Sequence, residues 1–226
     1  MGDMDRTDKN QGLTLPAELY LLACDIEKEK LGRREVLGNV LRAAVLVELT
    51  DRGCLIDEDG KAHTVGDRRT GDPVLDDSLR AIAEDRRPRK WKALVQLHRK
   101  QVFQGVEQQL VRERIIGIEH RTWRYDKIVV KDTGLAKRLR AEAVETLTSG
   151  RPVEDFSTRQ AALTALAALG ELPSVASGKE RREHKARIKA LTERAGQAGP
   201  ALKKALNEMD IATMVVITGA ATAAGN

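Results

Sequence analysis

The chain has 226 residues, 41% of them hydrophobic, which is enough to build the core of one large domain or two small ones. Only 3% are aromatic, which argues against a stacking platform for single-stranded nucleic acid, and the formal net charge is +5. Two cysteines, Cys24 and Cys54, fall in separate predicted elements, so we exclude a disulfide scaffold and expect reduced, buried thiols.

The chain is predicted to begin with a polar tail and two helices. Residues 1–12 carry three Asp and lack the apolar run of a secretory signal, which predicts a disordered tail and a cytoplasmic protein. Apolar residues at helical spacing predict a helix over 16–30, packed on one face. Denser apolar spacing predicts a second helix over 36–52, buried in the middle of a bundle and ending at Gly53.

After this helix the hydrophobic period changes to that of a β-hairpin. Residues 55–57 and 62–65 are predicted to form two short strands joined by a turn at Asp59-Gly60, because a tight hairpin turn needs positive φ values. A further helix is predicted over 73–84.

The same order of elements is then repeated. A basic helix is predicted over 90–104 and leads into 106–113, and residues 115–119 and 125–130 are predicted to form a second hairpin. A helix followed by a hairpin thus occurs twice, an arrangement seen in paired winged-helix units.

The rest of the chain is predicted to be helical. Asp132 or Thr133 should cap a helix that ends near Leu147. A second helix, which ends at Leu169, and two further helices should follow it. Residues 211–225 are predicted to form a final core helix, because a stretch this short and weakly polar cannot span a bilayer. We therefore predict no transmembrane segment.

A capping box supports the helix that follows the one ending near Leu147. Ser157 stands three residues before Gln160, and this helix should end at Leu169. The predicted fold class is mainly α: a single compact domain over 13–226, with a central helix bundle, amphipathic helices around it and two surface β-hairpins that form winged-helix-like units.

Charge is distributed unevenly along the chain. Residues 86–140 hold 16 Lys and Arg against 5 Asp and Glu, a net charge of +11. This stretch is basic enough to attract an anionic partner, although a solvated basic face balanced by acidic neighbours is the simpler alternative.

The sequence contains no recognisable motif for catalysis or metal binding. The four histidines lie far apart without metal-binding spacing, and neither the nucleophile elbow nor the glycine-rich phosphate loop is present. We expect a protein that is not an enzyme, with no catalytic residues, no metal and no cofactor.

Arg42 stands out because it lies inside an otherwise apolar helix. Burying an unpaired cation is costly, so this side chain should either pair with an acid or line the edge of a pocket. Both alternatives stay open at this point.

Three stretches together resemble the Golgi phosphoprotein 3 family, whose eukaryotic members bind phosphatidylinositol 4-phosphate. They are residues 13–22 (LTLPAELYLL), residues 46–49 (LVEL) with Arg52-Gly53, and residues 70–76 (TGDPVLD). The resemblance runs from Leu13 to the C-terminus and includes bacterial relatives of the same fold. It implies a mostly helical domain with surface β-hairpins.

The resemblance also implies a basic pocket for the lipid headgroup. Arg42 matches the pocket arginine of the second helix, and Lys100 matches the first of two basic residues on a later helix. Two positions differ: Arg33 stands where the family has tryptophan, and Phe103 replaces the second basic residue. The basic N-terminal arm of the eukaryotic members is also absent.

The second hairpin resembles the family's self-association element, with Trp123 and Tyr125 as candidate interface or membrane-contact residues. The leading hypothesis is a non-enzymatic peripheral membrane or adaptor protein that holds an anionic phospholipid headgroup, of phosphoinositide type, between Arg42, Lys100 and Arg33. The alternatives are a winged-helix-like regulator that binds nucleic acid, which the buried second helix disfavours, and a basic surface that serves only protein partners.

Overall fold

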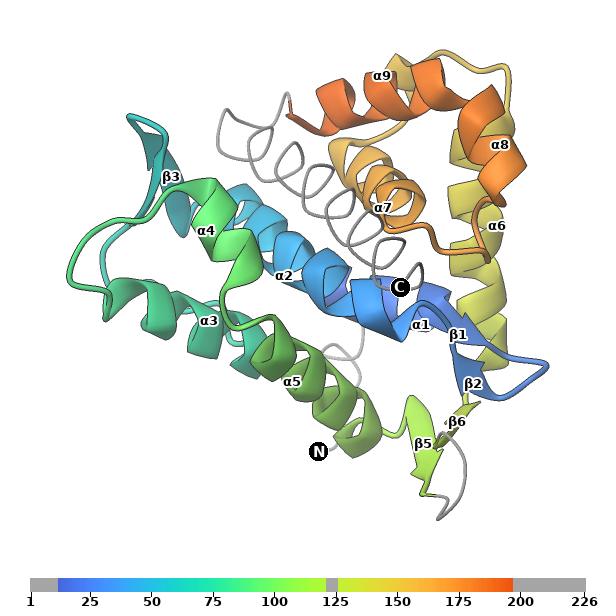
Figure 1. The fold of residues 1–226 in the computed structure, drawn as a ribbon, viewed down its shortest axis with the longest axis horizontal. Coiled ribbons are helices and arrows are strands. Elements are labelled where there is room, and N and C mark those ends of the chain that lie inside the picture. Colours follow the sequence, from blue (N-terminus) through green and yellow to red (C-terminus); the bar gives the residue numbers. More distant parts are fainter. Residues whose placement is uncertain (1–11, 121–125, 197–226) are drawn as a thin grey trace, which may run out of the picture.

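The computed structural model describes residues 12–120 and 126–196. Helices pack around the central helix α2 (Arg34–Asp51), with small antiparallel hairpins at the periphery (Figure 1). The neighbours of α2 are α1 (Leu15–Ala23), α3 (Pro73–Ala83), α4 (Trp91–Gln96), α5 (Arg99–Arg112) and α7 (Thr158–Leu169). The mainly helical fold class and the central, buried second helix are confirmed. The predicted tail, apart from Gly12, and the predicted helix over 211–225 lie outside the described residues.

The first helix is shorter than predicted. α1 ends at Ala23, and the strands β1 (Cys24–Asp25) and β2 (Lys30–Leu31) form a hairpin where the sequence predicted helix up to residue 30. The Asp25 carboxylate accepts a hydrogen bond from the Lys28 amide at 3.0 Å, which starts a turn in place of another helical turn. The prediction of a helix over 16–30 was therefore wrong beyond residue 23.

Both predicted hairpins are present. β3 (Leu55–Glu58) pairs with β4 (Lys61–Thr64), and β5 (Ile116–Glu119) pairs with β6 (Lys127–Val130). Asp59 and Gly60 both have positive φ (50° and 79°), as a two-residue hairpin turn requires. Each of these hairpins follows a helix, α2 or α5, so the predicted repetition of helix and hairpin is also present.

The basic helix predicted over 90–104 is interrupted. α4 ends at Gln96 and α5 begins at Arg99, because His98 takes a left-handed conformation with φ 57°. Tertiary contacts fix the two helices separately: Trp91 Nε1 donates to Asp57 Oδ1 on β3 at 2.7 Å, whereas Arg99 packs against Gly38 of α2. The break places the start of α5 beside the N-terminal half of α2.

Helices α6 (Thr133–Thr148), α7, α8 (Gly178–Glu183) and α9 (Lys185–Gly196) complete the described chain. Asp132 caps α6 by accepting a hydrogen bond from the Leu135 amide at 2.8 Å, and Ser157 with Gln160 forms the predicted capping box of α7. Within 12–120 and 126–196, no helix is both long enough and apolar enough to cross a bilayer. Cys24 and Cys54 are free and buried, as predicted.

Helices α7 and α2 approach each other closely at Gly170. A Cβ atom at this position would lie 2.4 Å from Val40 Cγ2 and 2.9 Å from the Leu166 carbonyl oxygen. We expect Gly170→Ala to lower the free energy of unfolding by about 1–3 kcal/mol, because the packed helices would have to separate. Urea denaturation measures this. Gly150→Ala is the matched control, since no atom lies within 4 Å of its Cβ position, and an equal loss there would contradict the packing argument.

Candidate functional site

Arg42 lies on the buried side of α2, where this helix meets α4. Its side chain is fully buried, and its Nε donates a hydrogen bond to the Leu94 carbonyl oxygen at 2.9 Å. No carboxylate in the described part of the chain forms an ion pair with it. Of the two alternatives that the sequence left open, pairing with an acid is therefore not observed among these residues. The last turn of α4 supplies a carbonyl oxygen instead.

Three buried donors next to this contact have no hydrogen-bond partner. They are Nη1 and Nη2 of Arg42 and Nδ2 of Asn39. Asn39 precedes Arg42 by three residues, so both side chains lie on one face of α2. Burial lowers the pKa of Arg42 to about 10, which leaves the guanidinium charged at neutral pH. An unpaired buried cation is costly, and an anion with several acceptor oxygens would satisfy all three donors.

The first turn of α5 adds exposed cations near this face. Lys100 is exposed there, and Arg99 Nη1 donates to Asn39 Oδ1 at 3.3 Å. No acidic residue occupies this turn, and His98 gives it no side-chain cap. The positive end of a 14-residue helix therefore lies on the same side of α2 as Asn39.

Arg33 and Phe103 are not brought together. Arg33 Nη2 forms an ion pair with Glu171 Oε2, and Arg181 contacts the same carboxylate at 3.1 Å, so Arg33 is directed toward the loop between α7 and α8. Phe103 is instead covered by Arg34, whose guanidinium carbon lies 5.2 Å from the ring centroid.

Sequence reasoning missed Asn39 at this site and Arg34 beside Phe103, and it placed Arg99 only in the basic segment, without its contact with Asn39. Asn39 could have been found, because a buried amide three residues before Arg42 shares its helix face. No local signal distinguishes Arg34 from Arg33. Their side chains point in different directions because Arg34 contacts Phe103 of α5 and Arg33 contacts Glu171 after α7. Trp123 and Tyr125, the candidate contact residues of the second hairpin, lie outside the described residues.

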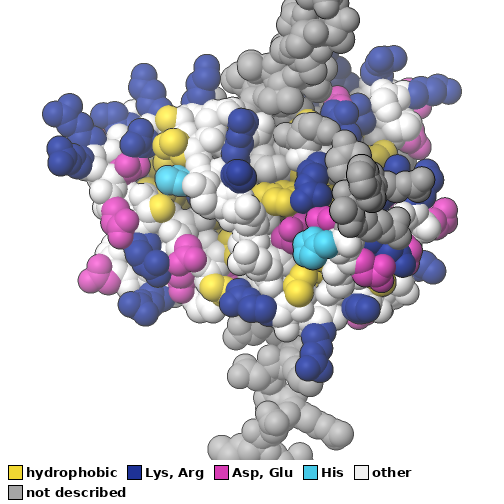
Figure 2. Space-filling view, turned by 60° about the horizontal axis from the view of Figure 1, so that its bottom comes forward, with side chains coloured by type: hydrophobic (Ala, Val, Ile, Leu, Met, Phe, Trp, Pro, Cys, Tyr) yellow, Lys and Arg dark blue, Asp and Glu magenta, His cyan; other side chains and the backbone are white. Residues whose placement is uncertain are grey.

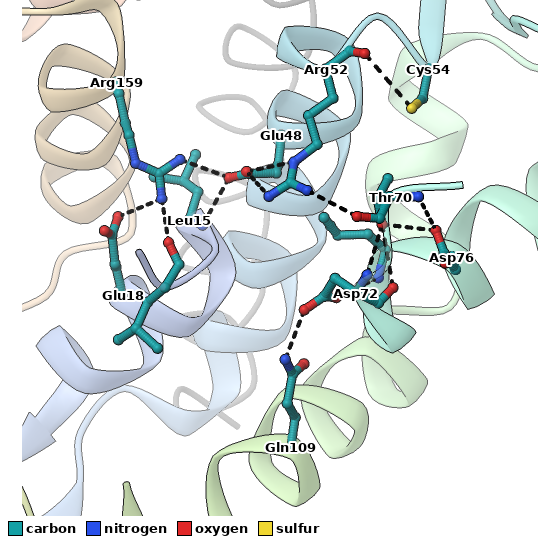
Figure 3. Close-up of polar contacts among 12 residues, drawn as sticks. Leu15, Glu18, Glu48, Arg52, Cys54, Thr70, Asp72, Asp76, Gln109 and Arg159 are labelled. Carbon is teal, nitrogen blue, oxygen red and sulfur yellow. Dashed lines mark hydrogen bonds and ion pairs between the residues drawn. The ribbon is translucent and has the colours of Figure 1, made fainter. Parts of the chain in front are cut away.

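A second polar cluster joins α1, α2 and α7 (Figure 3). Its centre is the buried Glu48 carboxylate, which accepts hydrogen bonds from the Leu15 amide at 2.9 Å, Arg159 Nη1 at 2.9 Å and Arg52 Nη2 at 2.7 Å. Arg159 also lies 3.1 Å from Glu18 Oε2. These contacts join three helices that are distant in sequence, α1, α2 and α7.

Glu18 and Glu48 respond differently to the same surroundings. Burial raises the pKa of Glu18 to about 7, although Arg159 opposes the shift. Burial alone would raise the pKa of Glu48 too, but Arg159, the Leu15 amide and Arg52 outweigh it and hold this pKa below its ordinary value. Glu18 therefore stabilises the fold most below pH 4.5, and this contribution is lost as the pH rises through about 7. Glu48 stabilises the folded state fully above pH 4.5, and this stabilisation is lost as the pH falls through its lowered pKa.

The loop at Thr70–Asp72 and the first turn of α3 join this cluster to α5 (Figure 3). The Asp72 carboxylate caps α3 by accepting from the Leu75 amide at 2.9 Å, and it accepts from Gln109 of α5 at 2.7 Å. The Asp76 carboxylate accepts from the Thr70 amide at 2.7 Å. These contacts fix the start of α3.

The residues that carry the family resemblance meet in this polar network. Leu15, Glu48, Arg52 and Asp72 belong to the three stretches, and all of them form the contacts just described. The stretches therefore hold the fold together, and Arg42 lies outside them. Among residues 12–120 and 126–196, no group of three or more His, Cys, Asp or Glu side chains could hold a metal ion.

Comparison with known proteins agrees with this architecture. The family model described as Golgi phosphoprotein 3 (GPP34) matches residues 15–209, which is most of the chain. A search of curated proteins finds no match. The match includes all three signature stretches apart from the first two residues of the first one, and it covers Arg42 and α5. The chain therefore belongs to the Golgi phosphoprotein 3 (GPP34) family.

Proposed function

We propose that this protein binds the phosphate headgroup of an anionic phospholipid, of phosphoinositide type, as a non-enzymatic peripheral membrane or adaptor protein. The single observation that carries the proposal is Arg42, a fully buried cation with two unpartnered nitrogen atoms. A phosphate group offers several acceptor oxygens, which suit the planar guanidinium, while Lys100 adds a point charge. Membership of the Golgi phosphoprotein 3 family supports the same ligand class.

Entry of a headgroup requires movement, because Arg42 is fully buried. The residues that separate α4 from α5, Leu97 and His98, lie between the carbonyl that holds Arg42 and the turn that carries Lys100. A shift of α4 about this break would release the Leu94 contact and leave the guanidinium free to turn toward phosphate oxygens. Such hinges commonly lie at the ends of helices.

The charge distribution favours a local site over a long basic surface. On the face shown in Figure 2, basic side chains are interspersed with acidic ones over the described part of the molecule. Several cations of the 86–140 segment are also engaged: Arg89 pairs with Asp85 at 2.6 Å, and Lys127 pairs with Glu29 at 2.8 Å. Duplex binding by helix insertion is disfavoured as well, because α2 is buried and cannot enter a groove.

Vesicle flotation tests the proposal. We expect the protein to float with phosphatidylcholine vesicles that contain phosphatidylinositol 4-phosphate and to stay in solution with phosphatidylcholine alone. The double variant Arg42→Met, Lys100→Gln should lose flotation, because the buried cation and the nearby lysine are both removed. Arg138→Gln removes an exposed cation of α6 and should float like the wild type.

Two results would contradict the proposal. One is equal recovery with charged and neutral vesicles, and the other is full flotation of the double variant. A salt-sensitive shift of duplex DNA by the wild type, with no flotation, would favour the nucleic-acid alternative.

A further inference from the structure

We infer that a hollow between the β1–β2 hairpin and α6 is a second binding site, which takes an amphipathic anion: an apolar chain that ends in a phosphate. The hollow has a volume of about 610 Å³. Its walls are the last turn of α1, the β1–β2 hairpin, the exposed side of α6 near Lys137, and the loop that joins α7 to α8 at Ser174. Pockets of a few hundred Å³ are of the size that holds a small organic ligand.

The hollow is distinct from the Arg42 site. Arg33, at its edge, is the N-cap residue of α2, and Arg42 lies eight residues after the first residue of this helix, which corresponds to about 12 Å along its axis. Arg42 contacts α4, whereas the hollow is lined by α1, α6 and the α7–α8 loop. The two sites therefore share no residue.

Basic side chains predominate at the hollow. Five of its lining residues are basic and two are acidic, a formal excess of three positive charges. The acidic Asp25 is already engaged, since it accepts from the Lys28 amide at 3.0 Å and lies 3.7 Å from Lys28 Nζ. Arg33 is paired with Glu171. Three exposed cations remain for which the described residues show no ion pair: Lys30, Lys137 and Arg140.

Two of these cations lie on one face of α6. Lys137 and Arg140 are three residues apart on α6, so they project from the same face of the helix over the hollow. Lys30 lines the same hollow from the hairpin. A phosphate held between an ammonium and a planar guanidinium would gain charge-assisted hydrogen bonds from both sides.

The floor of the hollow is apolar. Ile26 and Pro173, which are not buried, line it together with the buried Leu21, Leu22, Ala23 and Ala136. Covering Ile26 and Pro173 with a hydrocarbon chain would gain free energy, whereas a fully hydrated inorganic ion gains nothing from this surface. The apolar floor and the cations together favour a ligand that has both a hydrocarbon chain and a phosphate group.

The end of α1 presents few free carbonyl groups to an anion. The Leu22 carbonyl accepts a hydrogen bond from the Ser174 hydroxyl, and the Ala23 carbonyl accepts one from the Gly32 amide at 2.9 Å. The Leu21 carbonyl accepts from the Cys24 amide. These bonds satisfy the last turn of the helix, whose negative end would otherwise oppose an anionic group.

Isothermal titration calorimetry with three probes tests the inference: octyl phosphate below its micelle concentration, inorganic phosphate, and the neutral octyl glucoside. We expect octyl phosphate to bind at least about tenfold more tightly than either of the others, because only it engages both the cations and the floor. The double variant Lys137→Ala, Arg140→Ala should weaken octyl phosphate binding by about tenfold or more. Arg138→Ala, which removes a cation of the same helix outside the lining, should leave it unchanged.

Equal affinity for octyl phosphate and inorganic phosphate would overturn the inference, and so would unchanged binding by the double variant. Equal affinity for octyl phosphate and octyl glucoside would overturn it too. Arg42→Met separates this site from the headgroup site: it should abolish flotation while octyl phosphate still binds. A parallel loss of both would contradict the existence of a separate site.

Discussion

Arg42→Met is expected to raise the free energy of unfolding by about 1–3 kcal/mol while it abolishes binding to vesicles that contain phosphatidylinositol 4-phosphate. The guanidinium is fully buried and makes one hydrogen bond, to the Leu94 carbonyl. Methionine has a similar length and no charge, so it removes the cost of burying an unpaired cation and fills most of the same space. Thermal unfolding without ligand measures the gain, at about 2–4 °C for each kcal/mol in a chain of this size.

The control is Arg138→Met, an exposed position on α6 where the change should stay within about 0.5 kcal/mol. The pKa of Arg42 is lowered to about 10 by burial, so folding favours the neutral form, and the cost of burying the charge persists at every pH below that value. The advantage of the methionine variant should therefore shrink as the pH rises through 10. A variant that unfolds at a lower temperature than the wild type would show that Arg42 is structural.

Glu48→Ala should have the opposite effect and lower the free energy of unfolding by about 2–4 kcal/mol. The carboxylate is buried and accepts from the Leu15 amide and from two arginines, Arg52 and Arg159. Its removal leaves the amide without this partner and frees Arg159 beside Glu18. Arg159 is partly exposed, so solvent compensates part of the loss. Urea denaturation with a constant m value measures the effect.

Two further variants make this result specific. Glu145→Ala removes an exposed acid 3.4 Å from Arg151, and it should change stability by no more than about 0.5 kcal/mol. Glu48→Gln keeps an acceptor oxygen and should fall between the wild type and Glu48→Ala. If Glu48→Ala cost no more than Glu145→Ala, the network would not support the fold.

Local chemistry in the sequence was sufficient to predict most helix starts and turns. The caps at Asp132 and Ser157 and the turn at Asp59-Gly60 depend on residues next to one another, and all three are present. The break at His98 could not be predicted in this way, because no Gly or Pro marks it. It results from contacts of α4 with β3 and of α5 with α2, which join residues far apart in the chain.

The candidate site was predictable only in part. The apolar neighbours of Arg42 identify it as a buried cation, and its burial is confirmed. Its carbonyl partner comes from Leu94, 52 positions later in the sequence, and the ion pair of Arg33 comes from Glu171, 138 positions later. Neither partner can be recognised from the periodicity or the neighbouring residues. The polar network around Glu48 could not be predicted for the same reason, since Arg159 lies 111 positions away from Glu48.

The separation of Arg42 from the Glu48 network has a consequence for how ligand choice can diverge within this family. The residues by which the chain is recognised as a family member form the contacts whose loss should unfold it. Substitution of the buried cation should instead cost the fold nothing. Under the proposed function, changes around Arg42 would alter the choice of anionic ligand, while the motifs that mark the family stay intact.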